Sequence, residues 1–428
     1  MSTVKTSKLR WWGVFTLLLI VIISYVDRMN VSVLITNDEF LEHFGIKGDR
    51  IAQGELMSLF LIGYGVAAFF LSPLYETFLG VRKGLLFSIL LWAIMTIISP
   101  FAGSFFLLLI LRLILGASEG PLFSLKTMYI KDMFDKHERG KPNAVSSMGV
   151  SIGLAVGFPI VTYIIMHSHW QASYYILGLL NLVIGLPFIL LFIRDKAKSP
   201  NQRESKQVTM QQMKRLATTF RAAWKTPGLI WILLIEIATL SYLWGSSAWL
   251  PSYLLHERHF SLAQMGILSS LPFLFSIGSG FLGGYIIDRI PPKRVSILFV
   301  IGGIGTALSV SIAIFAGSPV VSAIGLIVAN LFWGIQGPAI PSIVQLAAPE
   351  ESVGSTYGIV NGVGNMVSAL MPTIMGAMIA GKGTESFSAG FTLLIGTQLL
   401  TVICAIIALK GNVFTPKEKT AGKHPSCT

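Results

Sequence analysis

Charged residues are scarce in this sequence. Of its 428 residues only 12% are Asp, Glu, Lys or Arg, whereas 53% are hydrophobic, and the mean hydropathy is +0.71. A soluble domain carries about 25% charged residues on average, so a soluble protein is excluded. Apolar stretches of roughly 20 residues, long enough to cross a bilayer as helices, recur along the chain instead. We therefore predict an all-α polytopic membrane protein.

Cysteine and intramembrane histidine are also lacking. Cys404 lies in the last apolar stretch and Cys427 in the C-terminal tail, which excludes a disulfide framework. All seven histidines fall outside the apolar stretches, and the pairs in "HSHW" and "HERH" lack a carboxylate cluster, so we predict no metal site. No glycine loop followed by Lys-Ser/Thr is present to bind ATP. We therefore expect no cofactor and no direct use of ATP.

The apolar stretches divide into two sets of six. A basic, polar linker at about 194–227 separates a first half, 1–193, from a second half, 228–410, which a tail at 411–428 follows. "LYETFLGVRK" after the second span and "GGYIIDRIPPKR" after the eighth form a weak internal repeat, typical of transporters with two related halves. The predicted spans are 11–35, 52–75, 84–102, 104–130, 143–166, 172–193, 228–254, 263–287, 294–316, 320–346, 353–379 and 386–410.

Basic residues outnumber acidic ones by 32 to 20, and their distribution predicts the topology. Twenty-five of the Lys and Arg residues fall on the side shared by both termini and the linker, and only four on the opposite side. By the positive-inside rule, both termini are cytoplasmic, in a multi-pass protein of the cell inner or plasma membrane. The charge therefore reflects contact with a lipid bilayer, and no nucleic-acid partner is expected.

Several charged residues lie inside the predicted spans of the first half, among them Asp27, Arg28, Arg112, Glu119 and Lys126. Each costs roughly 2.5–3.5 kcal/mol to insert, so each is expected to face the protein interior or an aqueous cavity. Arg112, Glu119 and Lys126 recur every seven residues and so share one face of the fourth span. We predict that Asp27 pairs with Arg112. The alternative is a permanent ion-pair network that only fixes helix packing.

The second half has aromatic and neutral polar residues in place of a charged face. We expect the first half to handle protons and substrate charge, and the second to orient the substrate body. For each aromatic, simple packing is the alternative, and hydrogen bonding between helices would equally explain the polar residues. The residues in question are Tyr242, Trp244, Trp249, Asn330, Trp333, Gln336, Asn361 and Asn365. Of these, Trp333, Asn361 and Asn365 are predicted to bind substrate, together with Tyr64 of the second span. Glu236 in the seventh span is equally compatible with a structural and a functional role.

Several segments, in order and at matching spans, resemble one family. They are "YVDRMNVSV", "RLILGASEGPLF", "WLPSYL", "GGYIIDR" and "NGVGNMVSALMP". The chain is similar over residues 10–410 to major facilitator superfamily transporters, and more narrowly to the anion:cation symporters that carry sugar acids and other organic anions. This resemblance implies twelve transmembrane helices in two pseudo-symmetric halves.

The resemblance also implies roles for individual residues. Arg28 binds the substrate carboxylate, Asp27 and Glu119 are the protonation sites that couple proton entry to substrate entry, and Arg112 modulates Asp27. Asp288 and Arg289 of "GGYIIDR" are the implied gating residues.

Two features depart from the family pattern. The loop after the second span usually reads Gly-x-x-x-Asp-Arg-x-Gly-Arg, whereas here Thr77 stands where Asp is expected, with Glu76 beside it, which puts the first-half gating contact in doubt. Lys126 is an additional cation that predicts a substrate more negative than a simple monocarboxylate. The alternative is that the Lys126 side chain snorkels, so that its ammonium lies at the cytoplasmic interface and does not contact the substrate.

The leading hypothesis is a monomeric, proton-coupled importer of an organic anion that works by alternating access, and not an enzyme. A proton-driven exporter of drugs or metabolites is the second, which Gly149, Gly153 and Gly157 in the fifth span support in part. A membrane enzyme would need a cluster of catalytic His, Asp or Ser at one interface, and the sequence offers none. The sequence does not specify which anion is carried.

Overall fold

The computed structural model describes residues 2–75, 79–135, 138, 140–194, 217–218, 220–349, 352–381 and 386–411. Within these ranges, twelve helices are long and apolar enough to cross a membrane, which confirms the predicted number of spans and the all-α class. Most of the predicted linker at 194–227, nearly all of the tail at 411–428, and residues Glu76 and Thr77 lie outside the described residues.

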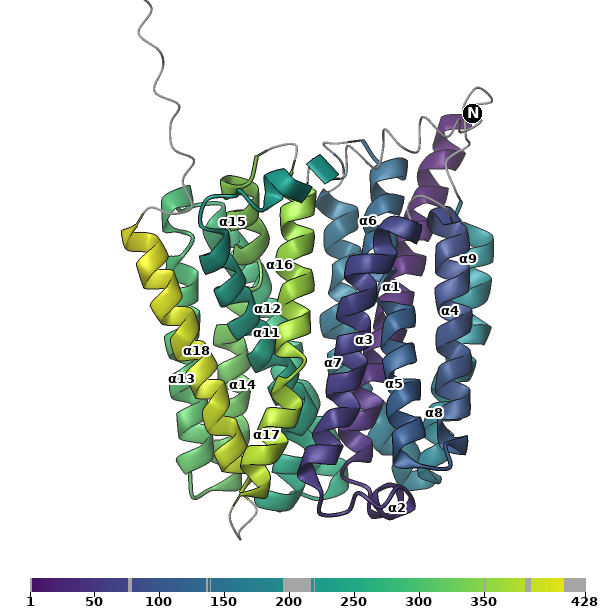
Figure 1. Ribbon diagram of the computed structural model, residues 1–428, viewed down its shortest axis with the longest axis vertical. Coiled ribbons are helices and arrows are strands. Elements are labelled where there is room, and N and C mark those ends of the chain that lie inside the picture. Colours follow the sequence, from purple (N-terminus) through teal and green to yellow (C-terminus); the bar gives the residue numbers. More distant parts are fainter. Residues whose placement is uncertain are drawn as a thin grey trace, which may run out of the picture.

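The helices of the first half stand together on the right in Figure 1. α2 is a short helix in the loop after the first span, α5 and α6 together form the fourth span, and the π-helix Asn181–Gly185 joins α8 to α9 in the sixth. The bounds are α1 Ser2–Leu34, α2 Asp38–His43, α3 Arg50–Leu74, α4 Gly80–Ile98, α5 Phe105–Glu119, α6 Leu122–Met133, α7 Gly140–His167, α8 Trp170–Leu180 and α9 Leu186–Phe192.

The helices of the second half stand on the left in Figure 1. α14 and α15 form the tenth span, α16 and α17 the eleventh, and the π-helix Tyr253–Glu257 extends α11. The bounds are α11 Leu229–Ser252, α12 Leu262–Ile287, α13 Ile297–Phe315, α14 Pro319–Gln336, α15 Ala339–Ala347, α16 Val353–Ser368, α17 Met371–Ala380 and α18 Phe387–Lys410.

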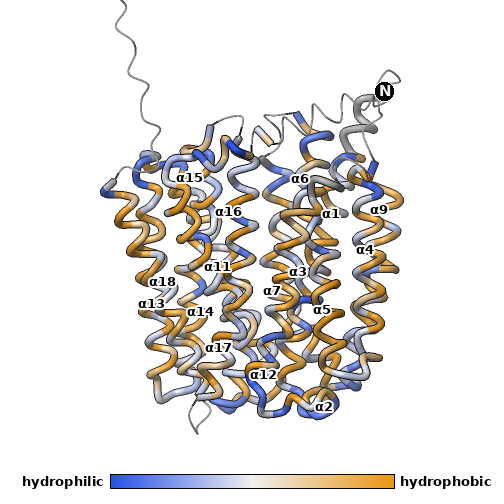
Figure 2. Tube along the Cα trace, in the orientation of Figure 1, coloured by the Kyte–Doolittle hydropathy of each residue, from blue (hydrophilic) through white to orange (hydrophobic). Residues whose placement is uncertain are grey.

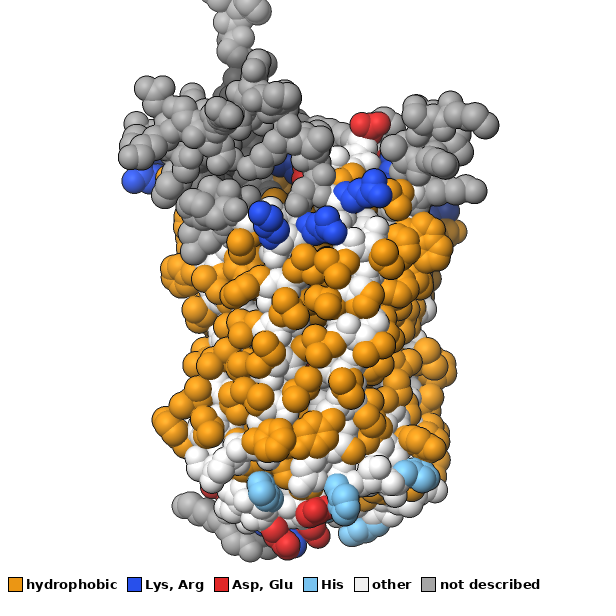
Figure 3. Space-filling view, turned by 90° about the vertical axis from the view of Figure 1, so that its right-hand side faces the viewer, with side chains coloured by type: hydrophobic (Ala, Val, Ile, Leu, Met, Phe, Trp, Pro, Cys, Tyr) orange, Lys and Arg blue, Asp and Glu red, His pale blue; other side chains and the backbone are white. Residues whose placement is uncertain are grey.

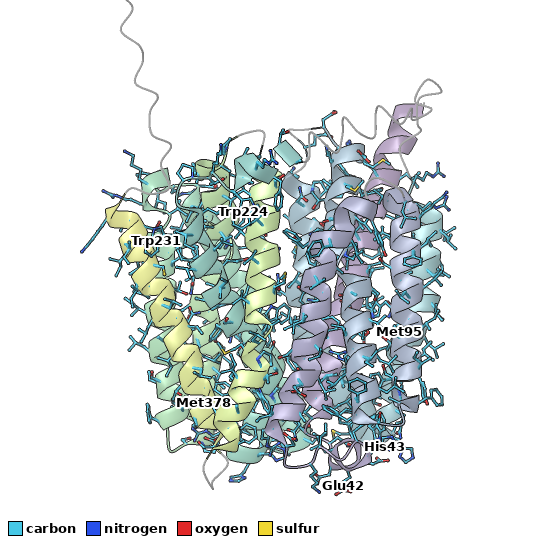
Figure 4. The ribbon with its side chains drawn as sticks, viewed as in Figure 1. Glu42, His43, Met95, Trp224, Trp231 and Met378 are labelled. Carbon is cyan, nitrogen blue, oxygen red and sulfur yellow. The ribbon has the colours of Figure 1, made fainter. Side chains whose placement is uncertain are left out.

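Hydrophobic residues predominate in the middle of the molecule (Figure 2), and their side chains cover the middle of the face in Figure 3. On the face in Figure 3, Lys and Arg lie at the upper end, and His with acidic residues at the lower end, which carries α2. Trp224 and Trp231 lie toward the upper end of the second half, and Glu42 and His43 at the lower end of the first (Figure 4). A broad apolar band between two polar ends is the surface that a bilayer requires.

The two halves pack tightly against each other toward the lower end. A Cβ on Gly376 of α17 would lie 2.2 Å from the carbonyl oxygen of Arg50 on α3, so only glycine allows this approach. The Thr373 hydroxyl donates to Ser58 Oγ at 2.8 Å between the same helices. Phe158 of α7 and Phe273 of α12 stack with ring centroids 5.8 Å apart. These contacts close the molecule between its halves on the side of α2.

Candidate functional site

A buried ion pair joins the first and fourth spans. Arg28 Nη2 lies 3.0 Å from Glu119 Oε2, both side chains are 0% exposed, and Arg28 Nε donates to the same oxygen at 3.2 Å. The Ser24 hydroxyl is a third donor to Oε2. Ser24 and Arg28 are four residues apart on α1, so one helix face presents both to α5. The site therefore gathers three donors on one carboxylate oxygen.

Aromatic rings surround the Arg28 guanidinium. Its central carbon lies 4.3, 5.1, 4.6 and 5.5 Å from the ring centroids of Tyr25, Phe60, Tyr64 and Trp244. Rings stabilise a desolvated cation through their negative faces. Trp244 belongs to α11, and its ring stacks on Tyr25 with the centroids 6.4 Å apart. Arg28 therefore lies where the two halves meet, and the predicted residue Tyr64 is beside it.

Asp27 is held by α4 and not by the predicted partner Arg112. Asp27 Oδ2 accepts hydrogen bonds from the indole of Trp92 and, at 2.8 Å, from the hydroxyl of Thr96. Arg112 Nε donates at 3.1 Å to the carbonyl oxygen of Leu56 on α3. Asp27 Oδ1 and both terminal nitrogens of Arg112 are buried without a hydrogen-bond partner. The predicted direct pair is therefore wrong, although the two residues still interact electrostatically.

The fourth span is interrupted, so its three charged residues are divided between two helices, with Arg112 and Glu119 on α5 and Lys126 on α6. α5 ends at Glu119, and α6 begins at Leu122 after Gly120 and Pro121, because proline lacks the N–H that would continue the helix. Close packing sets the position of Glu119. A Cβ on Gly116, one turn earlier, would lie 1.9 Å from the carbonyl oxygen of Phe60, so α5 packs directly on α3.

Lys126 lies beyond this break, on α6. Its ammonium donates to the hydroxyl of Ser147 on α7 at 2.8 Å and lies 4.6 Å from the ring centroid of Phe123. The residue is 4% exposed, so the side chain does not snorkel to the end of the span. Among the described residues it forms no ion pair with a carboxylate, which leaves its charge uncompensated by a direct partner.

The predicted residues of the second half form two polar contacts around α11. The indole of Trp244 donates to Asn365 Oδ1 at 3.0 Å, and the Asn365 amide donates in turn to the Asn361 side chain. The indole of Trp333 donates to the carbonyl oxygen of Thr239 on α11 at 3.2 Å. Asn365 is thus connected to the Arg28 site through Trp244, whereas Trp333 is directed to the α11 backbone.

The predicted gating residues Asp288 and Arg289 are exposed at the end of α12, and their role stays a prediction. The Arg289 guanidinium carbon lies 3.4 Å from the ring centroid of Tyr285, and Nη1 donates to the Tyr285 carbonyl oxygen at 3.3 Å. Arg289 therefore contacts its own helix in this conformation.

The sequence analysis missed the partners that hold the two carboxylates. Ser24 and Arg28 are four residues apart, and so are Trp92 and Thr96, and each pair converges on one carboxylate oxygen. Hydrogen-bond donors at this spacing on an otherwise apolar helix are a readable signal, because buried donors need acceptors.

Comparisons with known proteins identify the family of the chain. The sequence model of the family described as the Major Facilitator Superfamily matches residues 17–372 of this chain. The probable galactarate/D-glucarate transporter GudP of Bacillus subtilis (strain 168) is 25% identical, over 96% of this chain and 93% of that protein. The D-galactonate transporter of Escherichia coli O6:H1 (strain CFT073) is 24% identical, over 89% of this chain and 92% of that protein.

A crystal structure of a D-xylose-proton symporter has the same fold, with a TM-score of 0.74 over 95% of this chain and 98% of that one, at 15% identity. The relatives' names agree with the predicted group of organic anion symporters, and the family is one of transporters, not enzymes. The chain belongs to the Major Facilitator Superfamily.

Proposed function

We propose that the protein is a proton-coupled importer of a carboxylate of the sugar-acid class, with both termini in the cytoplasm. The observation that carries the proposal is the buried ion pair of Arg28 and Glu119 at the junction of the halves. Arginine presents a planar fork of donors that matches a carboxylate. A substrate carboxylate can therefore take the place that the Glu119 carboxylate occupies.

Protonation of Glu119 links the two events. A protonated Glu119 carries no charge and releases Arg28 to bind the anion, whereas an ionised Glu119 competes with the anion for the same guanidinium. Because linkage is reciprocal, a proton on Glu119 strengthens substrate binding as much as substrate binding strengthens protonation. Asp27 is the second proposed protonation site, since its ionised form balances the nearby charge of Arg112.

The conformation supports transport by alternating access. The contacts of Gly376, Thr373 and Phe273 with the first half close the side of α2, which the distribution of Lys and Arg makes the outer side. Rocking of the halves about the buried site would open that side and expose Arg28 to it.

The number of acidic groups on the substrate is set, in this proposal, by Lys126. D-Glucarate has two carboxylates and D-galactonate has one, and relatives are named for each. The buried ammonium of Lys126 supplies a second positive charge beyond Arg28 for the distal acidic group of a diacid. A diacid is therefore the better fit.

The test is uptake into proteoliposomes that contain the purified protein, with labelled D-glucarate and D-galactonate as probes. We expect accumulation above the outside concentration when the outside is acidic, and its loss when a protonophore collapses the gradient. The Arg28→Lys protein, for which we expect strongly reduced uptake, is assayed in parallel. Accumulation that is insensitive to the protonophore contradicts proton coupling, and acid-driven release of preloaded anion would indicate an exporter.

A further inference from the structure

Arg50, at the start of α3, contacts the second half with both its backbone and its side chain. Its carbonyl oxygen is the atom that lies against Gly376 of α17. Its guanidinium carbon lies 5.0 Å from the ring centroid of Phe387, the first residue of α18. Arg50 is 8% exposed and Phe387 is 3% exposed. A cation of the first half is therefore buried against two helices of the second half.

The Arg50 side chain is held in this direction by its own half. Nη1 donates to Oε1 of Gln53, which lies one turn later on α3, at 2.9 Å. Gln53 Nε2 donates in turn to the carbonyl oxygen of Ile46, in the loop between α2 and α3, at 2.9 Å. Both bonds lie within the first half, so they do not depend on the position of the second. The guanidinium is therefore oriented in advance, and less side-chain entropy is lost when it meets the ring.

The Phe387 ring belongs to an aromatic group of the second half. Its centroid lies 6.1 Å from that of Trp249 on α11, and 6.0 Å from that of the imidazole of His256, which is stacked on it. The indole of Trp249 donates to the carbonyl oxygen of Pro372 on α17 at 2.8 Å. Cation and ring are thus each supported within one half. The attraction between them, which a desolvated ring face provides, joins the two halves.

The contact lies at the outer end of a helix face that leads to Arg28. Buried side chains at alternating spacings of three and four residues share one face of α3, and they are Arg50, Gln53, Met57, Phe60 and Tyr64. Phe60 and Tyr64 contact the Arg28 guanidinium. Ten residues separate Arg50 from Phe60, which is about 15 Å along a helix. Arg50 therefore stands between the outer end of the molecule and the candidate substrate site.

We propose that Arg50 is a gating residue of the outer side, whose guanidinium holds this side closed through the ring of Phe387. The contact breaks when the halves part to admit the substrate. The inference rests on the alternating access of the proposed function. It adds an outer gate to the predicted gating residues Asp288 and Arg289, which lie at the cytoplasmic end in the proposed topology.

The test measures how far the halves are apart at the outer end in the full chain, in liposomes without substrate. Cys404 and Cys427 are replaced by alanine, and spin labels are attached through Ser168→Cys and Ser318→Cys, two exposed positions in outer loops of the first and second half. Electron–electron double resonance gives the fractions of molecules with short and long distances. The short distance represents the closed outer side.

Removing either partner of the contact should favour the open state. We expect Arg50→Gln and Phe387→Leu each to raise the ratio of long to short distances about tenfold, which corresponds to about 1.4 kcal/mol. Because each substitution breaks the same contact, the double variant should show a smaller shift than the sum of the two single shifts in free energy. An independent effect of each residue predicts a sum instead.

Two further variants make the result specific. Phe387→Tyr keeps an aromatic ring and should retain the wild-type distances, which a position that only needs to be filled by any large side chain would not distinguish from Phe387→Leu. Lys47→Gln removes an exposed cation near the same end, whose ion pairs with Asp38 and Glu42 stay within the first half, and should change nothing.

Unchanged distances in both Arg50→Gln and Phe387→Leu overturn the proposal, and so do fully additive shifts in the double variant. An equal shift in Phe387→Tyr and Phe387→Leu would show that the ring is not what Arg50 requires, and overturns it as well. Failure of the wild-type protein to accumulate any anion in a pH gradient would refute the proposed function alone, since the distances are measured without substrate and without a gradient.

Discussion

The fourth and tenth spans break in the same way but carry different chemistry. α5 ends at Glu119 and is followed by Gly120 and Pro121, and α14 ends at Gln336 and is followed by Gly337 and Pro338. The φ and ψ angles are −48° and −46° at Gly120 and −51° and −48° at Gly337. They are −69° and −12° at Pro121 and −71° and −14° at Pro338. The backbone is repeated in the two halves, and the carboxylate in one is an amide in the other.

The partners of these two side chains differ accordingly. Glu119 binds the guanidinium of Arg28, whereas Gln336 donates through Nε2 to Gln398 Oε1 at 3.1 Å. Titratable chemistry therefore occupies this break only in the first half, and the second half keeps a neutral amide pair at the equivalent place.

The first and seventh spans repeat the contrast. "SYVDR" ends at Arg28, and "SYLWG" in α11 has Trp244 and Gly245 where the first span has Asp27 and Arg28. The charged pair of one half is thus an aromatic ring and a glycine in the other. The difference teaches that a shared helical frame can hold a buried ion pair in one half and neutral side chains in the other, which is the asymmetry expected from the sequence.

Replacing Arg28 should have the largest effect, because it removes the planar guanidinium donors that we propose bind the substrate carboxylate. We expect Arg28→Lys to lower the uptake of labelled D-glucarate about a hundredfold, which corresponds to a loss of about 3 kcal/mol of charge-assisted hydrogen bonding. Uptake rates in proteoliposomes with equal amounts of wild-type and variant protein check this. Near-normal affinity in the variant would remove Arg28 from the substrate site.

Glu119→Gln should have the next largest effect, since it makes the first break chemically the same as the second. An amide cannot be protonated, so accumulation in a pH gradient should be lost. Exchange of labelled for unlabelled anion should persist within about tenfold, because Arg28 is then free to bind substrate. The exchange rate should also lose its dependence on pH, which counterflow at several pH values measures.

The converse change provides the control. Adding Gln336→Glu to Glu119→Gln should not restore accumulation, since Gly245 stands where an arginine would be needed. Restored accumulation would show that either half can carry the proton.

Sequence reasoning found the residues but not all of their partners. Charges in apolar spans are costly, so Asp27, Arg28, Glu119 and Lys126 were identifiable without a structure. Their pairing depends on helix rotation and on the break after Glu119, which a regular seven-residue spacing cannot predict. The ion pair of Arg28 with Glu119, and the hydrogen bond from Trp92 to Asp27, are therefore seen only in the structure.

Lys126 tests how far the charged half extends. Lys126→Gln should lower the uptake of D-glucarate about tenfold and that of D-galactonate about twofold, because only the diacid has a second carboxylate for the ammonium. Competition by each anion against the same labelled probe measures the ratio. Lys131→Gln, an exposed lysine on the same helix, is the matched control. Equal effects on both anions would show that Lys126 does not bind a second carboxylate, and would leave Arg28 as the main anion-binding charge.

The smallest effect is expected in the neutral half, at Asn365. Asn365→Ala leaves the Trp244 indole without its acceptor, at a cost of about 1–3 kcal/mol, but it changes no charge. We expect an affinity about fivefold weaker with an unchanged pH profile, since Trp244 stacks on Tyr25 and lies against the Arg28 guanidinium without exchanging a proton. Asn361→Ala leaves the contact between Trp244 and Asn365 in place and should weaken binding less. A shifted pH profile in Asn365→Ala would contradict the division of labour, because it would place part of the proton coupling in the half that has no carboxylate at its break.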